Sequence, residues 1–311
     1  MTMQRIAKED FSRMFRMDPS ELPERVVRLI GEYDLHYRPS QMKDLEEYVL
    51  NFLRLDEDGR PSRSGEENRL AFEHGWSENL DKLRQSDPGD YQLALKPGYF
   101  RGNRFFRYDN QLVVTDNYQL EYELFVMARL CIFHGWLAGA RVICEFGCGT
   151  CANLLLLSEA MPEATLIGLD WAKASRDIAS HLRQSLAKPI SGHVFNMLDP
   201  DHTLDIPEGA AMLSIHAFEQ LGTRFDAVLD FIMSKRPSIV VQYEPVLEFY
   251  DKESLLDVLA LRYCRKRGYL EGYYTKLRSL EEKGIIRILG AWRPYLGGVL
   301  HESSLIIWRP V

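Results

Sequence analysis

The stretch from Arg141 to Ala160 constrains the fold more than any other part of the chain. It begins with a short apolar run that ends in an acid, Glu145. A glycine-spaced turn follows, and then a second apolar run, Ala152 to Ala160. This order predicts a strand, a tight turn and a helix. Such a turn lets the backbone approach a ligand closely and directs the helix N–H groups at it.

The next apolar run indicates what such a ligand would contain. Residues 165–169 predict a neighbouring strand, and Asp170 follows it directly. An acid at the tip of the second strand is placed to bind ribose hydroxyls. The alternative role for Asp170 is a helix N-cap. Trp171 is a candidate to stack on an adenine ring.

Three interpretations of the turn compete. Gly147, Gly149 and Ala152 satisfy the dinucleotide pattern G-x-G-x-x-G/A. Cys144, Cys148 and Cys151 have the spacing of an iron–sulfur site, C-x-x-x-C-x-x-C. The third interpretation is an S-adenosylmethionine-binding turn of the E/D-x-G-x-G-x-G kind. Glu145 would repel a pyrophosphate, whereas it suits a ligand ammonium or water, so it favours the third.

The turn resembles motif I of the class I (Rossmann-like) methyltransferases, and the resemblance extends roughly from Leu112 to the C-terminus. It implies S-adenosyl-L-methionine as cofactor and S-adenosyl-L-homocysteine as product. The implied cofactor-binding residues here are Glu145, Gly147, Cys148 and Gly149. Cys151 stands where the pattern has its third glycine. The turn is therefore expected to avoid a backbone conformation that needs glycine.

Composition bears on the cysteines and on the surroundings of the protein. The chain has 311 residues, five cysteines and a formal net charge of −7. An odd number of cysteines suits reduced thiols in a cytoplasmic protein, with Cys144 packed as a small apolar residue. We expect neither a signal peptide in Met1 to Met17 nor a transmembrane run of about 18 apolar residues. The acidic balance argues against nucleic acid and membrane partners.

Beyond the turn, apolar runs of strand and helix length alternate. Strands are predicted at 141–145, 165–169, 191–196, 210–215 and 238–243, and two more at 285–292 and 303–308. Helices are predicted at 118–136, where Asp116 would be the N-cap, and at 152–160, 172–187, 217–235, 254–266 and 273–283. This order predicts an α/β fold with a doubly wound, mostly parallel seven-stranded sheet. The closing strand pair resembles the methyltransferase one, which implies an antiparallel last strand.

Residues 1–115 are predicted to form an α-helical N-terminal cap with a lid segment, and residues 116–311 the Rossmann-like domain. Helix starts are expected at Ser20, Ser40 and Glu66, and a polar loop at 56–67. Residues 91–118 are rich in aromatics, with a hairpin turn at Asp109-Asn110. The resemblance implies a lid here, with candidate substrate-binding residues Tyr99, Phe106, Tyr108 and Tyr118. The alternative is that these rings pack the cap onto the core.

Ligands of an open parallel sheet bind beyond the carboxyl ends of its strands. After the third strand, Asn196, Met197 and Asp199 are candidates to read adenine, or they are turn residues before Pro200. The segment after the fourth strand resembles that of small-molecule methyltransferases. It implies Ser214 at the cofactor, with His216 and Glu219 as catalytic candidates; His216 could instead be a core residue. Glu244 after the fifth strand is a third catalytic candidate, and His301 a further substrate-binding one.

These patterns predict transfer of a methyl group to an oxygen or nitrogen of a small-molecule acceptor, such as a natural product, a sugar or an amino-acid derivative. The reaction itself requires no metal, and the sequence shows no ligand spacing such as H-x-x-H. An NAD(P)-dependent oxidoreductase and a non-catalytic methyltransferase-like scaffold subunit are the alternatives. Apolar faces on the N-terminal helices could pair two chains into a homodimer.

Overall fold

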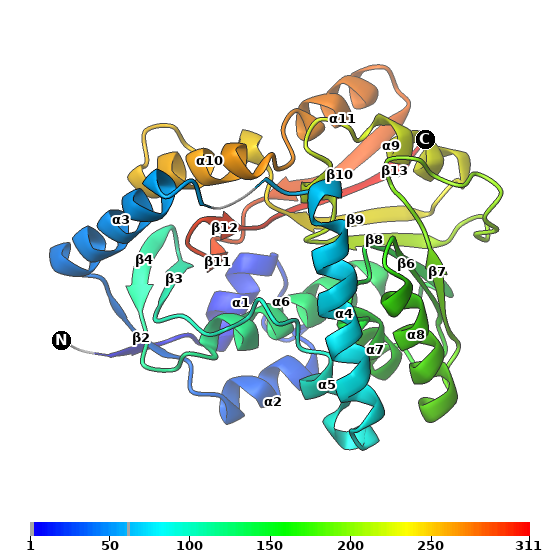
Figure 1. The fold of residues 1–311 in the computed structure, drawn as a ribbon, viewed down its shortest axis with the longest axis horizontal. Coiled ribbons are helices and arrows are strands. Elements are labelled where there is room, and N and C mark those ends of the chain that lie inside the picture. Colours follow the sequence, from blue (N-terminus) through cyan, green and yellow to red (C-terminus); the bar gives the residue numbers. More distant parts are fainter. Residues whose placement is uncertain (1–2, 61–62) are drawn as a thin grey trace.

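The computed structural model describes residues 3–60 and 63–311, which form two sheets surrounded by helices (Figure 1). The larger sheet has seven strands in the order β10-β13-β9-β8-β5-β6-β7. Its strands, in chain order, are β5 (Val142–Phe146), β6 (Thr165–Asp170), β7 (Ile190–Val194), β8 (Ala211–Ile215), β9 (Ile239–Glu244), β10 (Ile286–Trp292) and β13 (Ser304–Pro310).

One strand of this sheet is reversed. The strands β5 to β9 pair in parallel, whereas β13 pairs antiparallel with both β9 and β10. The predicted doubly wound sheet with an antiparallel last strand is therefore confirmed. All five residues of β8 are buried, as expected for a central parallel strand covered on both faces.

Helices cover both faces of the larger sheet. The helices α6 (Leu120–Leu137), α7 (Ala152–Ala160) and α8 (Lys173–Leu186) pack with Ile143 and Leu213 on one face. The helices α9 (Asp226–Ser234) and α11 (Tyr273–Glu282) pack with Cys144 and Met212 on the other. Consecutive strand residues point to opposite faces, so each strand contributes to both cores.

The N-terminal part contains the predicted helices and also a second sheet that the sequence did not predict, to which four short N-terminal strands belong. They pair with two strands near the C-terminus, in the order β1-β2-β4-β3-β11-β12. The strands are β1 (Gln4–Arg5), β2 (His36–Pro39), β3 (Phe105–Tyr108), β4 (Gln111–Val114), β11 (Leu296–Gly298) and β12 (His301–Glu302). The hairpin turn predicted at Asp109-Asn110 is confirmed, with both residues at positive φ.

The first part of the chain also supplies five helices and is not a separate body. The helices are α1 (Lys8–Phe15), α2 (Glu24–Glu32), α3 (Met42–Glu57), α4 (Arg69–Arg84) and α5 (Tyr91–Ala94). The apolar residues of α1 and α2 belong to the same core as α6. Trp292 of β10 donates a hydrogen bond from Nε1 to the carbonyl of Met14, 2.9 Å away. The boundary predicted at residue 115 therefore does not divide the core.

Four charged side chains, fully or almost fully buried, join the two sheets. Arg107 of β3 lies 2.5 Å from Asp257 and 3.1 Å from Glu302. Arg293 contacts the same two carboxylates at 2.8 and 2.7 Å. Asp257 lies on α10 (Leu255–Arg267) and Glu302 on β12. Buried charges are tolerated when they are paired in this way, and the pairing fixes β3 against the C-terminal part.

Several predicted boundaries shift. The helix predicted over 217–235 is interrupted at Gly222, which has positive φ and separates a 3₁₀ turn, Phe218–Leu221, from α9. Pro23 is the N-cap of α2, and Gln119 rather than Asp116 is that of α6. Other 3₁₀ turns are Glu66–Asn68, Pro88–Asp90 and Leu247–Phe249. Helix α3 extends into the loop predicted at 56–67, of which Pro61 and Ser62 lie outside the described residues.

Two further predictions concern the surface. Helix α3 exposes Leu50, Leu53 and Leu55, and pairing of two chains through such a face stays a prediction. Among the described residues, none of the helices combines the length and the apolar character needed to cross a bilayer.

Candidate active site

Two adjoining cavities lie at the carboxyl ends of the central strands. The larger has a volume of about 420 Å³ and the smaller about 60 Å³. The larger extends from the glycine turn after β5 to the turn after β8 and to β11 and β12. The smaller lies beside the residues that follow β6 and β7. Five residues line both cavities: Phe72, Trp76, Gly147, His216 and Gln220.

The glycine turn lines the larger cavity, and its Gly147 lines the smaller one as well. Neighbouring segments lie close to the backbone of the turn on both sides. Gly147 has a φ of 68°, and a Cβ there would lie 2.3 Å from the Cβ of Ala217. A Cβ on Gly149 would lie 3.2 Å from the indole ring of Trp76 on α4. The turn is thus held between the segment after β8 and the N-terminal helix α4. Only glycine fits at Gly147 without moving the backbone.

Cys151 contradicts one expectation from the sequence. Its φ is 59°, so it adopts the left-handed conformation that the sequence argument excluded for a non-glycine residue. The side chain is fully buried, and its Sγ lies 3.3 Å from the carbonyl oxygen of Ser175. Left-handed backbone costs an L-residue about 1–2 kcal/mol. Burial of the thiol and its hydrogen bond compensate for part of that cost.

The three cysteines of the turn do not converge. Cys144 packs in the core on one face of the sheet, whereas Cys148 and Cys151 pack in the core on the other. All five cysteines are buried free thiols. Burial raises the pKa of Cys144, which disfavours the thiolate that a cluster needs. The arrangement supports the structural role of Cys144.

Asp170 lies between the turn and the smaller cavity, as predicted. One carboxylate oxygen accepts a hydrogen bond from the Gly149 N–H at 2.9 Å, and the other from the Ala172 N–H at 2.8 Å. Burial raises the pKa of Asp170 to about 6. Each oxygen retains a second lone pair, and the residue lines the cavity. The N-cap of α8 is Ala172, so the alternative role of Asp170 as the N-cap is wrong, although its carboxylate accepts a hydrogen bond from the Ala172 N–H.

The remaining wall of the smaller cavity comes from residues predicted to contact adenine. Trp171, Asn196 and Met197 all line it. The Trp171 ring lies 5.9 Å from that of Phe72, so helix α4 covers this cavity too. The Oδ1 of Asn196 accepts a hydrogen bond from Leu198 N–H, which is the predicted turn chemistry and leaves the amide NH₂ as a donor. These residues form a flat apolar slot with polar edges.

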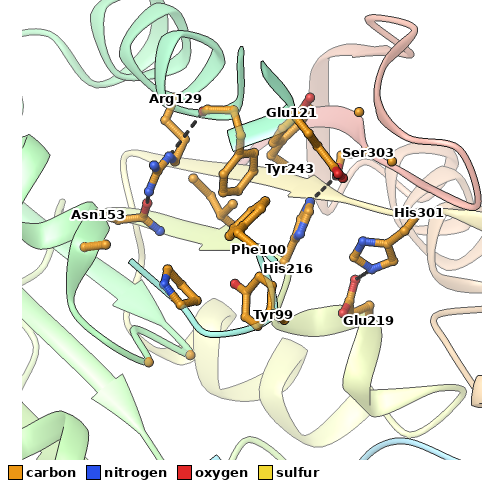
Figure 2. A pocket seen from close by; sticks show the side chains of 18 of the residues that line it. Tyr99, Phe100, Glu121, Arg129, Asn153, His216, Glu219, Tyr243, His301 and Ser303 are labelled. Carbon is orange, nitrogen blue, oxygen red and sulfur yellow. Dashed lines mark hydrogen bonds and ion pairs between the residues drawn. The ribbon is translucent and has the colours of Figure 1, made fainter. Parts of the chain in front are cut away.

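A buried cation stands at the opposite end of the turn. Arg129 of α6 lines the larger cavity and donates from Nη1 to the Oδ1 of Asn153, 2.6 Å away. Asn153 in turn donates to Glu145. The Nη2 of Arg129 has no hydrogen-bond partner within residues 3–60 and 63–311. Figure 2 shows Arg129 and Asn153 together at one side of the cavity. The site thus offers an unused donor on a fixed positive charge.

Glu145 does not face either cavity, which corrects its predicted direct role. It is fully buried behind Asn153, and burial raises its pKa to about 8. Its contribution to a ligand would pass through Asn153 and Arg129. Cys148 and Gly149, in contrast, line the larger cavity as predicted.

No protein-family model matches the sequence, and no curated protein matches it. Several solved structures are similar to it at low sequence identity. One is an O-methyltransferase of a trans-AT polyketide synthase from Brevibacillus brevis, crystallised with S-adenosyl-L-homocysteine. The two sequences are 10% identical, the TM-score is 0.45, and the match covers 62% of this chain and 74% of that chain. Another is geranyl diphosphate C-methyltransferase from Streptomyces coelicolor A3(2): 11% identity, TM-score 0.44, over 63% of this chain and 85% of that chain.

A third similar structure is the 4+2 cyclase SpnF, with 12% identity and a TM-score of 0.49, over 80% of this chain and 97% of that chain. The three likenesses are partial, with TM-scores below 0.5. A shared fold does not fix an activity, so what the site does has to be argued from its own residues.

On the side of the larger cavity away from Arg129, two histidines and a glutamate lie close together. His216 and Glu219 follow β8, and His301 begins β12 (Figure 2). The Nε2 of His301 lies 2.5 Å from a carboxylate oxygen of Glu219. The Nε2 of His216 lies 2.5 Å from the Ser303 hydroxyl. His216 has a φ of 55°, a strained backbone of the kind found at functional sites.

The two histidines differ in protonation. Burial, together with the charge of His301, lowers the pKa of His216 to about 3, so its ring is neutral at physiological pH. Burial alone would lower the pKa of His301, but the Glu219 carboxylate outweighs it and raises that pKa. His301 is therefore a stronger base than His216, the residue chosen from sequence.

Glu244, predicted to be catalytic, lies outside both cavities. One of its oxygens accepts hydrogen bonds from the Ala217 and Phe218 N–H groups, each at 3.1 Å. Its other oxygen accepts one from the Glu219 N–H at 3.3 Å, and the Ser214 hydroxyl also donates to the carboxylate. These contacts hold the turn that carries Glu219. Glu244 and Ser214 are thus positioning residues, not residues that touch a ligand.

The aromatic candidates divide into two groups. Tyr99 and Phe106 line the larger cavity, which supports a lid role for part of the segment 91–118. Tyr108 is buried against Tyr37, with ring centroids 5.0 Å apart, in the core of the second sheet. Tyr118 is 58% exposed and outside both cavities. Asp199 is also exposed beyond the smaller cavity. The structure places none of these last three residues in either cavity.

Sequence reasoning missed several residues of the site. Arg129 is the single charge in the apolar run 124–133, a signal that was available. Asn153 adjoins the glycine turn, where polar side chains often meet ligands. Phe72 and Trp76 on α4 carry no such signal, because only the fold brings that helix over the turn.

Proposed function

We propose that the chain transfers a methyl group from S-adenosyl-L-methionine to an oxygen or nitrogen of a small-molecule acceptor. The observation that carries the proposal is the pair of adjoining cavities around the glycine turn, with an acid at the small one and a buried cation at the large one. This layout fits a ligand with an adenosine end and an amino-acid end, joined where Gly147 and His216 line both cavities.

In this proposal the smaller cavity holds the adenosine. Asp170 accepts the ribose hydroxyls through the lone pairs that face the cavity. Trp171 and Met197 flank the adenine ring, and the free amide NH₂ of Asn196 reads a ring nitrogen. The slot is apolar with few polar groups, as is typical of sites for flat heterocycles.

Arg129 then binds the carboxylate of the methionine end. Arg129 lines the larger cavity, its buried Nη2 has no hydrogen-bond partner among the described residues, and a charge-assisted hydrogen bond to the carboxylate would satisfy it. The link through Asn153 to Glu145 fixes the guanidinium, so little side-chain entropy is lost on binding. No phosphate is needed to explain this cation, which favours S-adenosyl-L-methionine over a dinucleotide.

Gly147 and His216, which line both cavities, would hold the sulfonium, and His216, Glu219 and His301 would face the methyl group that it supplies. The acceptor occupies the remainder of the larger cavity, whose volume of about 420 Å³ suits a small molecule. Its oxygen or nitrogen attacks the methyl carbon, the carbon–sulfur bond breaks, and S-adenosyl-L-homocysteine leaves. The acceptor loses one proton, and the three side chains control that loss. Alignment in line with sulfur supplies much of the rate enhancement.

The N-terminal segment encloses both ligands. Phe72 and Trp76 of α4 line both cavities, and Tyr99 and Phe100 close the larger one (Figure 2). Exclusion of water protects the alignment and strengthens the charge interactions inside. The five buried thiols fit a reducing compartment, and we assign the protein to the cytoplasm.

Calorimetric titration with S-adenosyl-L-methionine and S-adenosyl-L-homocysteine tests the proposal. Wild type should bind both with micromolar affinity. Asp170→Asn retains an acceptor oxygen for the turn but loses the charge, and should weaken binding about 10-fold or more. Asp199→Asn is the matched control, because Asp199 also follows a strand but lies outside both cavities. Binding of NADH instead, or equal affinity of the two variants, would refute the assignment.

A further inference from the structure

The fold brings together two histidines and a glutamate that are far apart in sequence. His216 and Glu219 are three residues apart in the turn after β8, and His301 comes from β12 of the second sheet. One donor atom from each lies within 4.8 Å of the donor atoms of the other two. Sequence spacing gave no sign of this cluster, because its third member is more than 80 residues away.

The three side chains are held in place before any ligand arrives. The Nε2 of His216 is fixed by the Ser303 hydroxyl at 2.5 Å. One oxygen of Glu219 accepts a hydrogen bond from the Gln220 amide at 2.7 Å, so the other is left for His301. Glu244 holds the backbone of the same turn through three N–H groups. Outer contacts of this kind orient the ligands of metal sites.

We propose that His216, Glu219 and His301 bind a divalent transition metal ion, zinc or iron(II). Two imidazoles and one carboxylate form the ligand set of catalytic zinc sites and of non-haem iron(II) sites, both of which keep open positions. Magnesium and calcium prefer oxygen ligands and fit this set poorly. His216, Glu219 and His301 all line the larger cavity, so the open positions face the acceptor.

The distances require only a small adjustment. The Nε2 of His301 and a carboxylate oxygen of Glu219 are 2.5 Å apart and are joined by a hydrogen bond, whose proton they share. Ligand bonds of about 2.0–2.2 Å place neighbouring donor atoms roughly 3.0–3.5 Å apart. The metal therefore replaces the shared proton and separates the pair by less than about 1 Å. A ring nitrogen of His216, which lies within 4.8 Å of the other two donor atoms, would move closer to complete the set.

The role of the metal rests on the methyl transfer proposed above. A hydroxyl of the acceptor binds the open position, and its proton passes to water, because a metal ion lowers the pKa of a bound hydroxyl. The metal-bound oxygen then attacks the methyl carbon, and sulfur keeps the electron pair of the broken bond. The metal also fixes the direction of attack. An acceptor with two neighbouring oxygens would bind most tightly.

Metal binding can be measured without any acceptor. Wild-type protein is purified, analysed for zinc and iron, stripped with a chelator, and titrated with Zn²⁺ and, without oxygen, with Fe²⁺. We expect one ion per chain. His301→Gln and His216→Asn should each weaken binding at least 100-fold, and asparagine tolerates the left-handed backbone at position 216. His74→Asn is the control, since His74 forms an exposed pair with Glu78, 3.3 Å apart.

The metal found in the protein as purified distinguishes zinc from iron. Equal metal affinity in wild type and in both site variants would overturn the proposal, as would the absence of binding in wild type. Thermal unfolding of each variant checks that the loss is not a loss of fold. S-adenosyl-L-homocysteine binding is measured in parallel. If it fails while the metal binds, the methyl-transfer proposal is wrong and the metal site stands.

Discussion

Replacing Arg129 with methionine tests the proposed contact to the methionine carboxylate of the cofactor separately from the contacts to its adenosine end. The guanidinium is buried, with Nη1 on Asn153, Nε 3.2 Å from the carbonyl of Phe125, and Nη2 without a partner among the described residues. A hydrogen bond to a charged group contributes about 1.5–3 kcal/mol. Loss of the contact to the methionine carboxylate should therefore raise the Kd of S-adenosyl-L-homocysteine about 10- to 150-fold.

The assay compares S-adenosyl-L-homocysteine with 5′-methylthioadenosine, which has the adenosine end and lacks the amino acid. Arg129→Met should weaken the first ligand and leave the second within about two-fold, since Asp170 and Trp171 are unchanged. Arg183→Met, at an exposed position on α8, is the control and should alter neither Kd. The reasoning is refuted if both ligands weaken equally, which would indicate a general disturbance of the site, or if neither does.

Three further predictions concern stability and pH. Burial raises the pKa of Glu145 to about 8 from an ordinary value of 4.5, so above pH 4.5 the folded state keeps a proton that the unfolded chain loses. The free energy of unfolding of the wild type, measured in urea, should therefore fall between pH 5 and 8.5. Glu145→Gln should show a smaller fall over the same range. An equal loss in the two proteins would contradict this. Arg107→Met should lower the free energy of unfolding by about 3–5 kcal/mol, because it breaks a buried ion-pair network. The Arg104 side chain is 40% exposed and lies 3.7 Å from Asp44, so Arg104→Met should lower the free energy of unfolding by less than about 1 kcal/mol. Chemical denaturation of both variants checks the difference. Cys151→Gly should change the free energy of unfolding by less than about 1 kcal/mol, because relief of the left-handed backbone offsets the lost thiol contacts. Cys151→Val should lower it by more than about 2 kcal/mol, because a β-branched residue is strained in that conformation. Similar denaturation midpoints for the two variants would count against backbone strain at this position.

The sheet could be predicted because its signals are local. Alternating apolar runs and the spacing of Gly147 and Gly149 specify parallel strands and the turn between the first strand and its helix. Asp170 followed from its place after the second strand. The positions of Trp171, Asn196 and Met197 followed from the same rule, because strand ends meet at one edge of a parallel sheet.

The second sheet and the acceptor side of the site depend on contacts between segments that are distant in sequence. Glu244 is a strand-end carboxylate like Asp170, but backbone N–H groups of the neighbouring turn occupy it, and no sequence pattern reveals that. The strands β11 and β12 have three and two residues, too short for a periodic signal. Because β12 carries His301 to Glu219, the acceptor end of the site was only partly visible in the sequence.

The pairing of β3 with β11 sets a condition on biosynthesis. Tyr108 pairs with Leu296, which follows it by 188 residues. The strands β1 to β4 leave the ribosome well before β11 and β12, so their sheet is completed only after β11 and β12 have been translated. Helix α6 can cover α1 and α2 earlier, but Trp292, which donates to the carbonyl of Met14, is also translated late. Nascent chains of this protein should therefore depend on chaperones and should be sensitive to premature termination, because partly made products expose surface that only the C-terminal residues can cover.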